Sequence, residues 1–99
     1  MAQRKIIWTE KAHFERKEIL NYWIIRNKSK VYSIKLNKLF IDTLKQIAEN
    51  PNIGRKTELK DVRVKIVRNY LLFYEYSQKQ IKVLTLWDGH RNEKPREIK

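Results

Sequence analysis

The chain has 99 residues, of which 23 are Lys or Arg and 11 are Asp or Glu, so its formal net charge is +12. The absence of cysteine excludes disulfides, thiolate metal sites and cysteine nucleophiles, and two histidines are too few for a metal site built from imidazoles alone. A hydrophobic content of 41% excludes a disordered basic tail. Because domains commonly span about 100–150 residues, we expect one domain over residues 1–99, with a polar tail over residues 93–99.

Apolar runs are short throughout the sequence. The longest, at residues 22–25 and 70–74, fall far below the roughly 20 residues that a membrane-spanning helix needs. The first residues also lack the apolar core of a signal peptide, which is about 7–15 residues long. We therefore expect a cytoplasmic protein with no membrane contact. The excess of positive charge predicts a polyanion or an acidic protein as its partner.

The first half of the chain predicts a strand followed by two helices. Residues 5–9 (KIIWT) are β-branched and aromatic, as is typical of a strand. Thr9 can cap a helix over residues 10–27, and a second helix is expected over residues 30–49. The short polar break between the helices predicts an antiparallel helical hairpin. The second helix ends before Pro51, because proline disfavours helical geometry in the residue that precedes it.

In the second half the hydrophobic period changes from 3.6 to 2. Strands are expected over residues 62–68, 70–76 and 81–88, with turns at 68–69 and 77–80. The predicted order is β-α-α-β-β-β, an α+β fold in which an N-terminal strand and a helical hairpin pack on a small, mainly antiparallel sheet. Three successive strands without crossover helices exclude a Rossmann fold.

Aromatic residues are frequent in the predicted strands. Tyr70, Tyr74 and Tyr76 share one face of a strand, and Trp8 and Trp87 belong to other strands. Such rings could stack on the bases of a single-stranded nucleic acid. Alternating aromatic and aliphatic residues are typical of a half-buried sheet, so we expect these rings to pack beneath the helical hairpin.

Motifs for several enzyme classes are missing. The sequence contains no G-x-G-x-x-G, no phosphate-binding loop, no G-x-S-x-G and no H-E-x-x-H. No cofactor, metal or small-molecule ligand is therefore expected. The informative feature is instead a concentration of basic residues in the second half.

Arg63 and Lys65 lie two apart on a predicted strand and therefore project from the same face. His90 and Arg91 follow the last strand, where they could join that face. Arginine and lysine bind phosphate, and histidine exchanges a proton near neutral pH, so these four residues could serve metal-independent RNA cleavage. The same alternation is also typical of a plain solvated strand face, and both interpretations stay open. Further candidates for binding a target or a nucleic acid are Arg55, Lys56, Lys60, Arg68, Lys82 and Asp88.

Four segments, in order, resemble the RelE/ParE superfamily of toxins from type II toxin–antitoxin systems. They are IIWTEKA (6–12), ENPNIGRKTEL (49–59), YLLFYEY (70–76) and IKVLTLWDGHRN (81–92), and the resemblance covers roughly residues 3–95. It implies a small sheet with a helical hairpin, in agreement with the prediction above. It also implies a growth-inhibiting, plasmid-stabilising toxin that is neutralised by an acidic antitoxin encoded beside it.

The RelE-like branch of the superfamily consists of ribosome-dependent mRNA endonucleases. Its motif places an arginine after a tyrosine, and here Leu71 stands in that position. Arg63 and Lys65 could match the basic strand positions of that branch, and Arg91 matches a late arginine. No tyrosine follows Tyr76, although that branch has one near its C-terminus. If the chain were RelE-like, its catalytic residues would be Arg63, Lys65, His90 and Arg91.

The ParE-like branch poisons DNA gyrase. It commonly carries a hydrophobic-Phe-Tyr segment like residues 72–74, and it ends the last strand with a pattern like Asp88-Gly89-His90-Arg91. The resemblance therefore favours a ParE-like toxin. The alternatives are a RelE-like endonuclease acting on ribosome-bound mRNA and a non-toxic nucleic-acid-binding module. The expected antitoxin has an acidic or amphipathic helix and an extended segment, which lie across the helical hairpin or the sheet.

Overall fold

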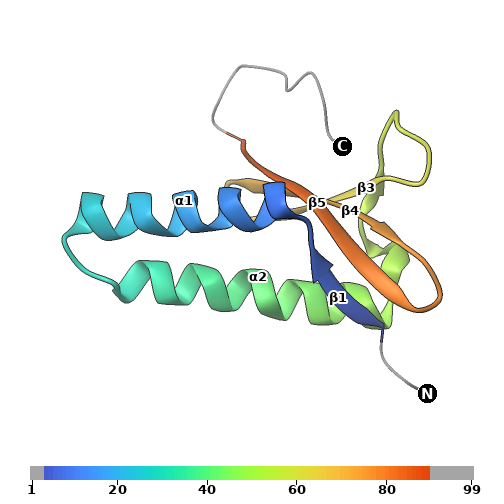
Figure 1. Cartoon of the computed structure of the whole chain (residues 1–99), viewed down its shortest axis with the longest axis horizontal. Coiled ribbons are helices and arrows are strands. Elements are labelled where there is room, and N and C mark those ends of the chain that lie inside the picture. Colours follow the sequence, from blue (N-terminus) through green and yellow to red (C-terminus); the bar gives the residue numbers. More distant parts are fainter. Residues whose placement is uncertain (1–3, 90–99) are drawn as a thin grey trace.

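The structure, a computed structural model, describes residues 4–89 and confirms the predicted α+β fold (Figure 1). Each predicted helix and strand begins and ends within one residue of its expected bounds. The elements are β1 (Lys5–Trp8), α1 (Glu10–Asn27), α2 (Val31–Glu49), the 3-10 turn η1 (Pro51–Ile53), β2 (Arg55–Lys56), β3 (Arg63–Val67), β4 (Tyr70–Tyr76) and β5 (Gln80–Asp88).

The strands form one five-stranded sheet in the order β1-β5-β4-β3-β2. β1 is parallel to β5, and the other neighbouring pairs are antiparallel. The two-residue strand β2 is absent from the sequence prediction, because two residues are too few to show an alternation. It forms by pairing with the first part of β3. The sheet therefore has β1 at one edge and β2 at the other.

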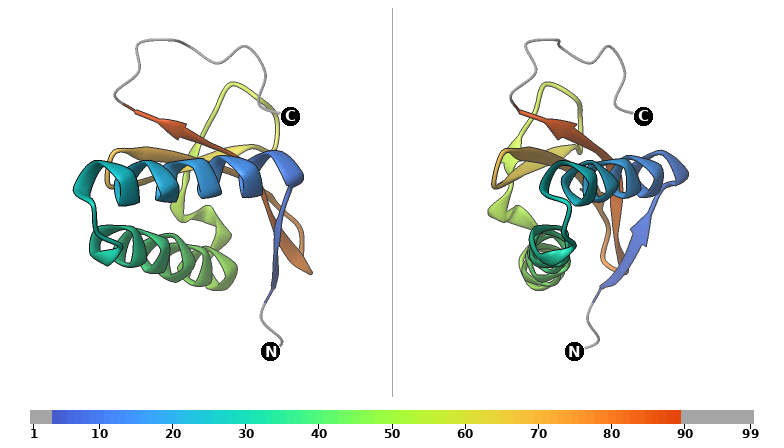
Figure 2. Two further views of the ribbon diagram at one scale, coloured as in Figure 1. Left: turned by 60° about the vertical axis from the view of Figure 1, so that its left-hand side comes forward. Right: turned by 90° about the vertical axis from the view of Figure 1, so that its left-hand side faces the viewer.

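Local signals explain where the helices begin and end. The Thr9 side chain accepts a hydrogen bond from the Ala12 N–H and donates one to the Leu84 carbonyl, both at 3.1 Å. The same residue thus caps α1 and ties its start to β5. α1 ends at Asn27, and the residue that caps it, Lys28, has a left-handed φ of 53°. The two helices lie next to each other, as the right-hand view of Figure 2 shows nearly end-on.

The main core lies between the helices and one face of the sheet. α2 supplies the largest share of it, with Leu36, Phe40, Leu44 and Ile47 almost fully buried. The strands contribute Tyr70, Leu72, Tyr74, Ile81, Val83 and Leu86. The prediction that Tyr70 and Tyr74 pack beneath the hairpin is therefore confirmed. Trp8 also packs against this core, whereas the Tyr76 ring is 38% exposed.

A second apolar cluster occupies the opposite face of the sheet. Val62, Phe73 and Leu84 are buried there, and Val64, Leu71 and Trp87 pack against them. Ile66 belongs to the same side, because it lies directly opposite Leu71. We call these seven residues the open face, since none of the helix residues described belongs to the cluster. The prediction that Trp87 packs beneath the hairpin is wrong, because β5 turns that ring to the open face.

Candidate functional site

Arg63 and Lys65 project from the same face of β3, as predicted. They lie directly opposite Tyr74 and Leu72, which places them on the side of the sheet that carries the helices. Both side chains are only partly exposed, so they do not form a plain solvated strand face. The Arg63 Nη1 donates to the Gly54 carbonyl at 2.7 Å and reaches the Asn52 carbonyl at 3.4 Å. The guanidinium therefore holds the chain between η1 and β2 against β3.

Lys56 and Lys60 gather near Arg63. Lys56 lies opposite Arg63 in the β2–β3 ladder, and Lys60 belongs to the loop between these strands. All three line one hollow at this end of the sheet, together with the Tyr76 ring. Glu58 and Asp61 line the same hollow. The carboxylates offset part of the positive charge that would attract a phosphate there.

The other basic candidates lie elsewhere on the sheet. Arg55 is directly opposite Val64 and so borders the open face. Arg68 lies in the tight turn between β3 and β4, where its φ is 57°. Lys82 is directly opposite Glu75, on the side of the sheet opposite to Tyr74 and Tyr76. The structure thus brings Lys56, Lys60 and Arg63 together and places Arg55, Arg68 and Lys82 apart from them. His90, Arg91 and the polar tail lie outside the described residues.

Leu71 is the residue for which the resemblance to the RelE-like branch predicts an arginine. Its neighbours in register are Ile66 on β3 and Trp87 on β5, so it is surrounded by apolar side chains of the open face. The Phe73 and Trp87 rings meet nearby, with centroids 4.2 Å apart. An arginine side chain at position 71 would project from a face that is apolar at its centre. This position contributes apolar contact and no positive charge.

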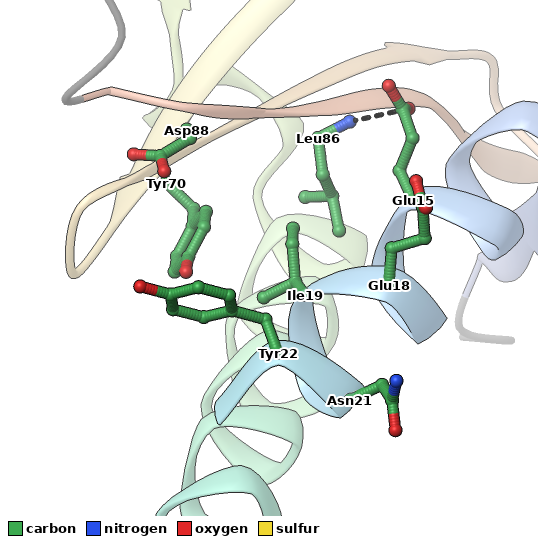
Figure 3. Close-up of a pocket in the computed structure, with 8 residues that line it drawn as sticks. All are labelled: Glu15, Glu18, Ile19, Asn21, Tyr22, Tyr70, Leu86 and Asp88. Atoms are coloured by element: carbon green, nitrogen blue, oxygen red, sulfur yellow. Dashed lines mark hydrogen bonds between the residues drawn. The ribbon is translucent and has the colours of Figure 1, made fainter. Parts of the chain in front are cut away.

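A hollow that the sequence did not indicate lies between α1 and the second half of β5 (Figure 3). Its volume is about 570 Å³, and three of its lining residues are the acids Glu15, Glu18 and Asp88. The Glu15 carboxylate accepts hydrogen bonds from the Thr85 hydroxyl at 2.6 Å and the Leu86 N–H at 3.2 Å. It thereby satisfies a donor of β5 beyond the end of β1. Sequence reasoning missed this contact because its partners are 70 and 71 positions apart.

Two tyrosine hydroxyls are held inside the main core. Burial raises the pKa of Tyr70 and of Tyr74 above the ordinary value for a phenol, so both stay protonated near neutral pH. The Tyr70 oxygen accepts a hydrogen bond from Trp23 Nε1 at 2.8 Å. The Tyr74 oxygen lies between the Pro51 carbonyl and the Gly54 N–H. These contacts position the two hydroxyls as parts of the scaffold.

Two features of the described part of the chain bear on ligands and membranes. Across residues 4–89, no group of three or more His, Asp or Glu side chains is arranged to hold a metal ion. Neither of the two long helices in this range is apolar enough to cross a membrane.

Known proteins share both sequence features and the fold with this chain. A family model described as "ParE toxin of type II toxin-antitoxin system, parDE" matches residues 6–93. Among solved structures, one chain from the "Chromosomal ParDE TA system from P. aeruginosa" is similar, with a TM-score of 0.71 and 18% sequence identity. The similarity covers 85% of this chain and 94% of that chain, and at this identity it shows a shared fold. No curated protein matches the chain by sequence.

Proposed function

The chain belongs to the ParE toxin family of type II toxin–antitoxin systems, and on that premise we propose that it arrests growth by poisoning DNA gyrase. The match to this family confirms the membership of the RelE/ParE superfamily that the resemblance predicted. The gyrase target is the further step of the proposal. The observation that supports it most directly is the apolar environment of Leu71.

RNA cleavage without a metal requires a base, an acid and cations that converge on one phosphate. Leu71 replaces the arginine that the RelE-like motif would supply, and it packs among Ile66 and Trp87. The Arg63 guanidinium is engaged by backbone carbonyls of Asn52 and Gly54. Both features favour a toxin that acts by binding its target, as expected for a gyrase poison.

We also propose a cognate ParD antitoxin as the partner. The formal charge of +12 favours an acidic partner, and opposite charges speed the encounter of two proteins. Apolar anchors usually supply most of the affinity in such complexes. The chain has exposed apolar side chains available for this purpose on its helices and on its sheet.

The test is induced expression in a bacterial host, with growth, plasmid supercoiling and mRNA integrity measured in the same cultures. We expect growth arrest, altered plasmid supercoiling and intact mRNA. Co-expression of the protein encoded by the neighbouring reading frame should restore growth. A purified gyrase supercoiling assay, with and without that protein, then separates a direct effect on gyrase from a secondary one.

Two other outcomes would contradict the proposal. Arrest with mRNA cut within codons would identify a RelE-like endonuclease that acts without an arginine at position 71. Absence of arrest, combined with DNA or RNA binding that weakens steeply with salt, would identify a nucleic-acid-binding module instead.

A further inference from the structure

Exposed apolar side chains are concentrated in one part of the helical hairpin. Of the nine large apolar side chains that are exposed within residues 4–89, five belong to residues 22–41, which we call the outer hairpin. They are Tyr22 and Ile25 on α1 and Val31, Ile34 and Ile41 on α2, with exposures between 37% and 68%. Single exposed apolar residues are common on protein surfaces, but a concentration of them marks a surface that another molecule covers.

The same part of the chain carries positive charge alone. Between Glu18 and Asp42 the sequence contains five Lys or Arg and no Asp or Glu. The five cations are Arg26, Lys28, Lys30, Lys35 and Lys38, and the side chains of all five are exposed. The outer hairpin therefore combines apolar contact with a local charge of +5, which attracts an acidic partner.

Contacts with the rest of the molecule hold the outer hairpin in place. The Trp23 and Tyr32 rings meet edge to face with their centroids 4.8 Å apart, so the two helices are joined close to the turn. Trp23 Nε1 also donates to the Tyr70 hydroxyl at 2.8 Å, which connects the hairpin to β4. At the start of α2, the Ser29 hydroxyl oxygen accepts a hydrogen bond from the Val31 N–H at 3.2 Å. A surface that is ordered before binding loses less entropy when it meets a partner.

The turn of the outer hairpin lies at one end of the molecule. In Figure 1 it extends to the left beyond the sheet, and the right-hand view of Figure 2 faces it. The start of α1 lies at the other end of the hairpin, where Thr9 bonds to β5. A projecting end of this kind can enter a recess on a larger partner while the sheet stays outside it.

Other kinds of partner fit this surface less well than an acidic protein does. A nucleic acid would use the cations but would leave Ile25, Val31 and Ile34 exposed to water. A bilayer takes up a continuous apolar stripe, whereas Lys38 lies between Ile34 and Ile41 on one side of α2, at spacings of four and three residues. A second copy of the chain would bring the same five cations to the contact, which opposes self-association.

We propose that the outer hairpin is the surface with which the toxin contacts its target protein. The target surface that fits it has an apolar recess for Ile25, Val31 and Ile34, with carboxylates that face Arg26 and Lys35. The apolar anchors supply the affinity, and the cations speed the encounter. This inference rests on the proposed function, because it names the contact through which the toxin reaches gyrase.

The first test compares two exposed apolar residues of the helices. Ile34→Glu places a negative charge on the outer hairpin, where Ile34 is 66% exposed, and Phe14→Glu places the same charge near the start of α1, where Phe14 is 61% exposed. Each purified full-length toxin is titrated into purified gyrase, and inhibition of supercoiling is measured in parallel. We expect Ile34→Glu to weaken binding and inhibition by about tenfold or more. Phe14→Glu should stay within about twofold of the unaltered toxin, as for a residue outside the contact.

A second pair of variants tests the charges. Lys35→Glu reverses an exposed charge of the outer hairpin, and Lys17→Glu reverses an exposed charge of α1 outside it. Lys35→Glu should slow association with gyrase at low salt, and Lys17→Glu should slow it much less. The difference should shrink as salt is added, because exposed charges are screened. Equal effects of the two variants would mean a general attraction to a basic protein, which contradicts a local contact.

The outcomes separate this inference from the proposed function. If the unaltered toxin neither binds nor inhibits gyrase, the proposed function fails and the inference falls with it. If the unaltered toxin binds gyrase and both Ile34→Glu and Lys35→Glu bind equally well, the inference is overturned and the gyrase target stands. Losses of equal size in Ile34→Glu and Phe14→Glu would also overturn it, because the contact would then not be confined to the outer hairpin.

Vesicles that contain phosphatidylglycerol test a membrane as the partner instead. Sedimentation with such vesicles should give the same result for Ile34→Glu as for the unaltered toxin. If Ile34→Glu lost vesicle binding and kept gyrase binding, the outer hairpin would be a membrane-binding surface and the inference would be overturned. The unfolding temperature is measured for all four variants, so that a loss of binding counts against or for the contact only in a folded chain. Lys35 is exposed, so the charge pair keeps the test decisive if Ile34→Glu does not fold.

Discussion

The Tyr74 hydroxyl occupies the space that a side chain at position 54 would need. A Cβ added to Gly54 would lie 2.5 Å from that oxygen. The hydroxyl donates to the Pro51 carbonyl at 2.6 Å and accepts from the Gly54 N–H at 3.0 Å. The middle of β4 thus fixes the chain where α2 gives way to β2, and glycine at position 54 allows the close approach.

Tyr74→Phe should destabilise the fold because two buried backbone groups lose the hydroxyl to which they are hydrogen-bonded. The Pro51 carbonyl and the Gly54 N–H would lose a partner in a buried place, which costs about 1–3 kcal/mol. Urea unfolding measures this loss. The matched control is Tyr76→Phe, which removes an exposed hydroxyl bonded to Asn52 Oδ1 and should cost less than about 0.5 kcal/mol. Equal losses in the two variants would contradict the structural role of Tyr74.

Gly54→Ala should be destabilising although the backbone at this position suits any residue. The φ of Gly54 is −78°, so the cost comes from contact with the Tyr74 ring, which is fully buried and cannot move aside. We expect a loss of about 1–3 kcal/mol, typical of overpacking. In the double variant with Tyr74→Phe the two losses should not add, because removing the hydroxyl relieves part of the contact. Additive losses would rule out this contact as the cause.

Stability should fall at alkaline pH through the buried tyrosines. The pKa values of Tyr70 and Tyr74 are raised in the folded state, chiefly by burial, above the value of 10.0 for an exposed phenol. The unfolded chain therefore releases these protons first, and the stabilisation present below pH 10 is lost as pH rises through the folded-state pKa values. Tyr74→Phe should show a shallower fall of unfolding free energy above pH 10 than the unaltered chain.

The sequence predicts the helices and long strands well, because their hydrophobic periods are clear. It does not predict which face of β3 meets the helices. Val64 and Ile66 are apolar and Arg63 and Lys65 are basic, yet the apolar pair lies on the open face. β4 decides this register, and its sequence is apolar on both sides, so alternation within β3 alone carries too little information.

Local periodicity also fails to predict contacts between residues that are far apart in the sequence. The contact of Glu15 with Thr85 and Leu86 exists because β1 stops at Trp8 and leaves the rest of β5 for α1 to cover. Neither the position where a strand pairing ends nor the residue that replaces it can be deduced from local periodicity. Leu71, in contrast to Glu15, could be singled out from the sequence alone, because it follows Tyr70 at a defined position of a motif.

Glu15→Ala tests whether the Glu15 carboxylate serves as the hydrogen-bond acceptor for β5 where β1 no longer pairs with it. The Leu86 N–H and the fully buried Thr85 hydroxyl would lose their acceptor, at a cost of about 1–3 kcal/mol. Glu18→Ala removes an exposed carboxylate of the same helix and should change stability by less than about 0.5 kcal/mol. Thermal unfolding of both variants measures the difference. Hydrogen exchange at Leu86 should accelerate only in Glu15→Ala, and unchanged exchange there would contradict the assigned contact.

Arg63→Ala separates a structural arginine from a catalytic one. Because the guanidinium holds the carbonyls of Gly54 and Asn52, its loss should lower the free energy of unfolding by about 1–2 kcal/mol. Toxicity should then fall only as far as the folded fraction falls, so a lower growth temperature should restore it. Lys65→Ala, on the same strand face, should have a smaller effect on stability. A catalytic Arg63 would behave differently: the variant would stay folded and lose mRNA cleavage by about a hundredfold or more at every temperature. That result would favour the endonuclease over the gyrase poison.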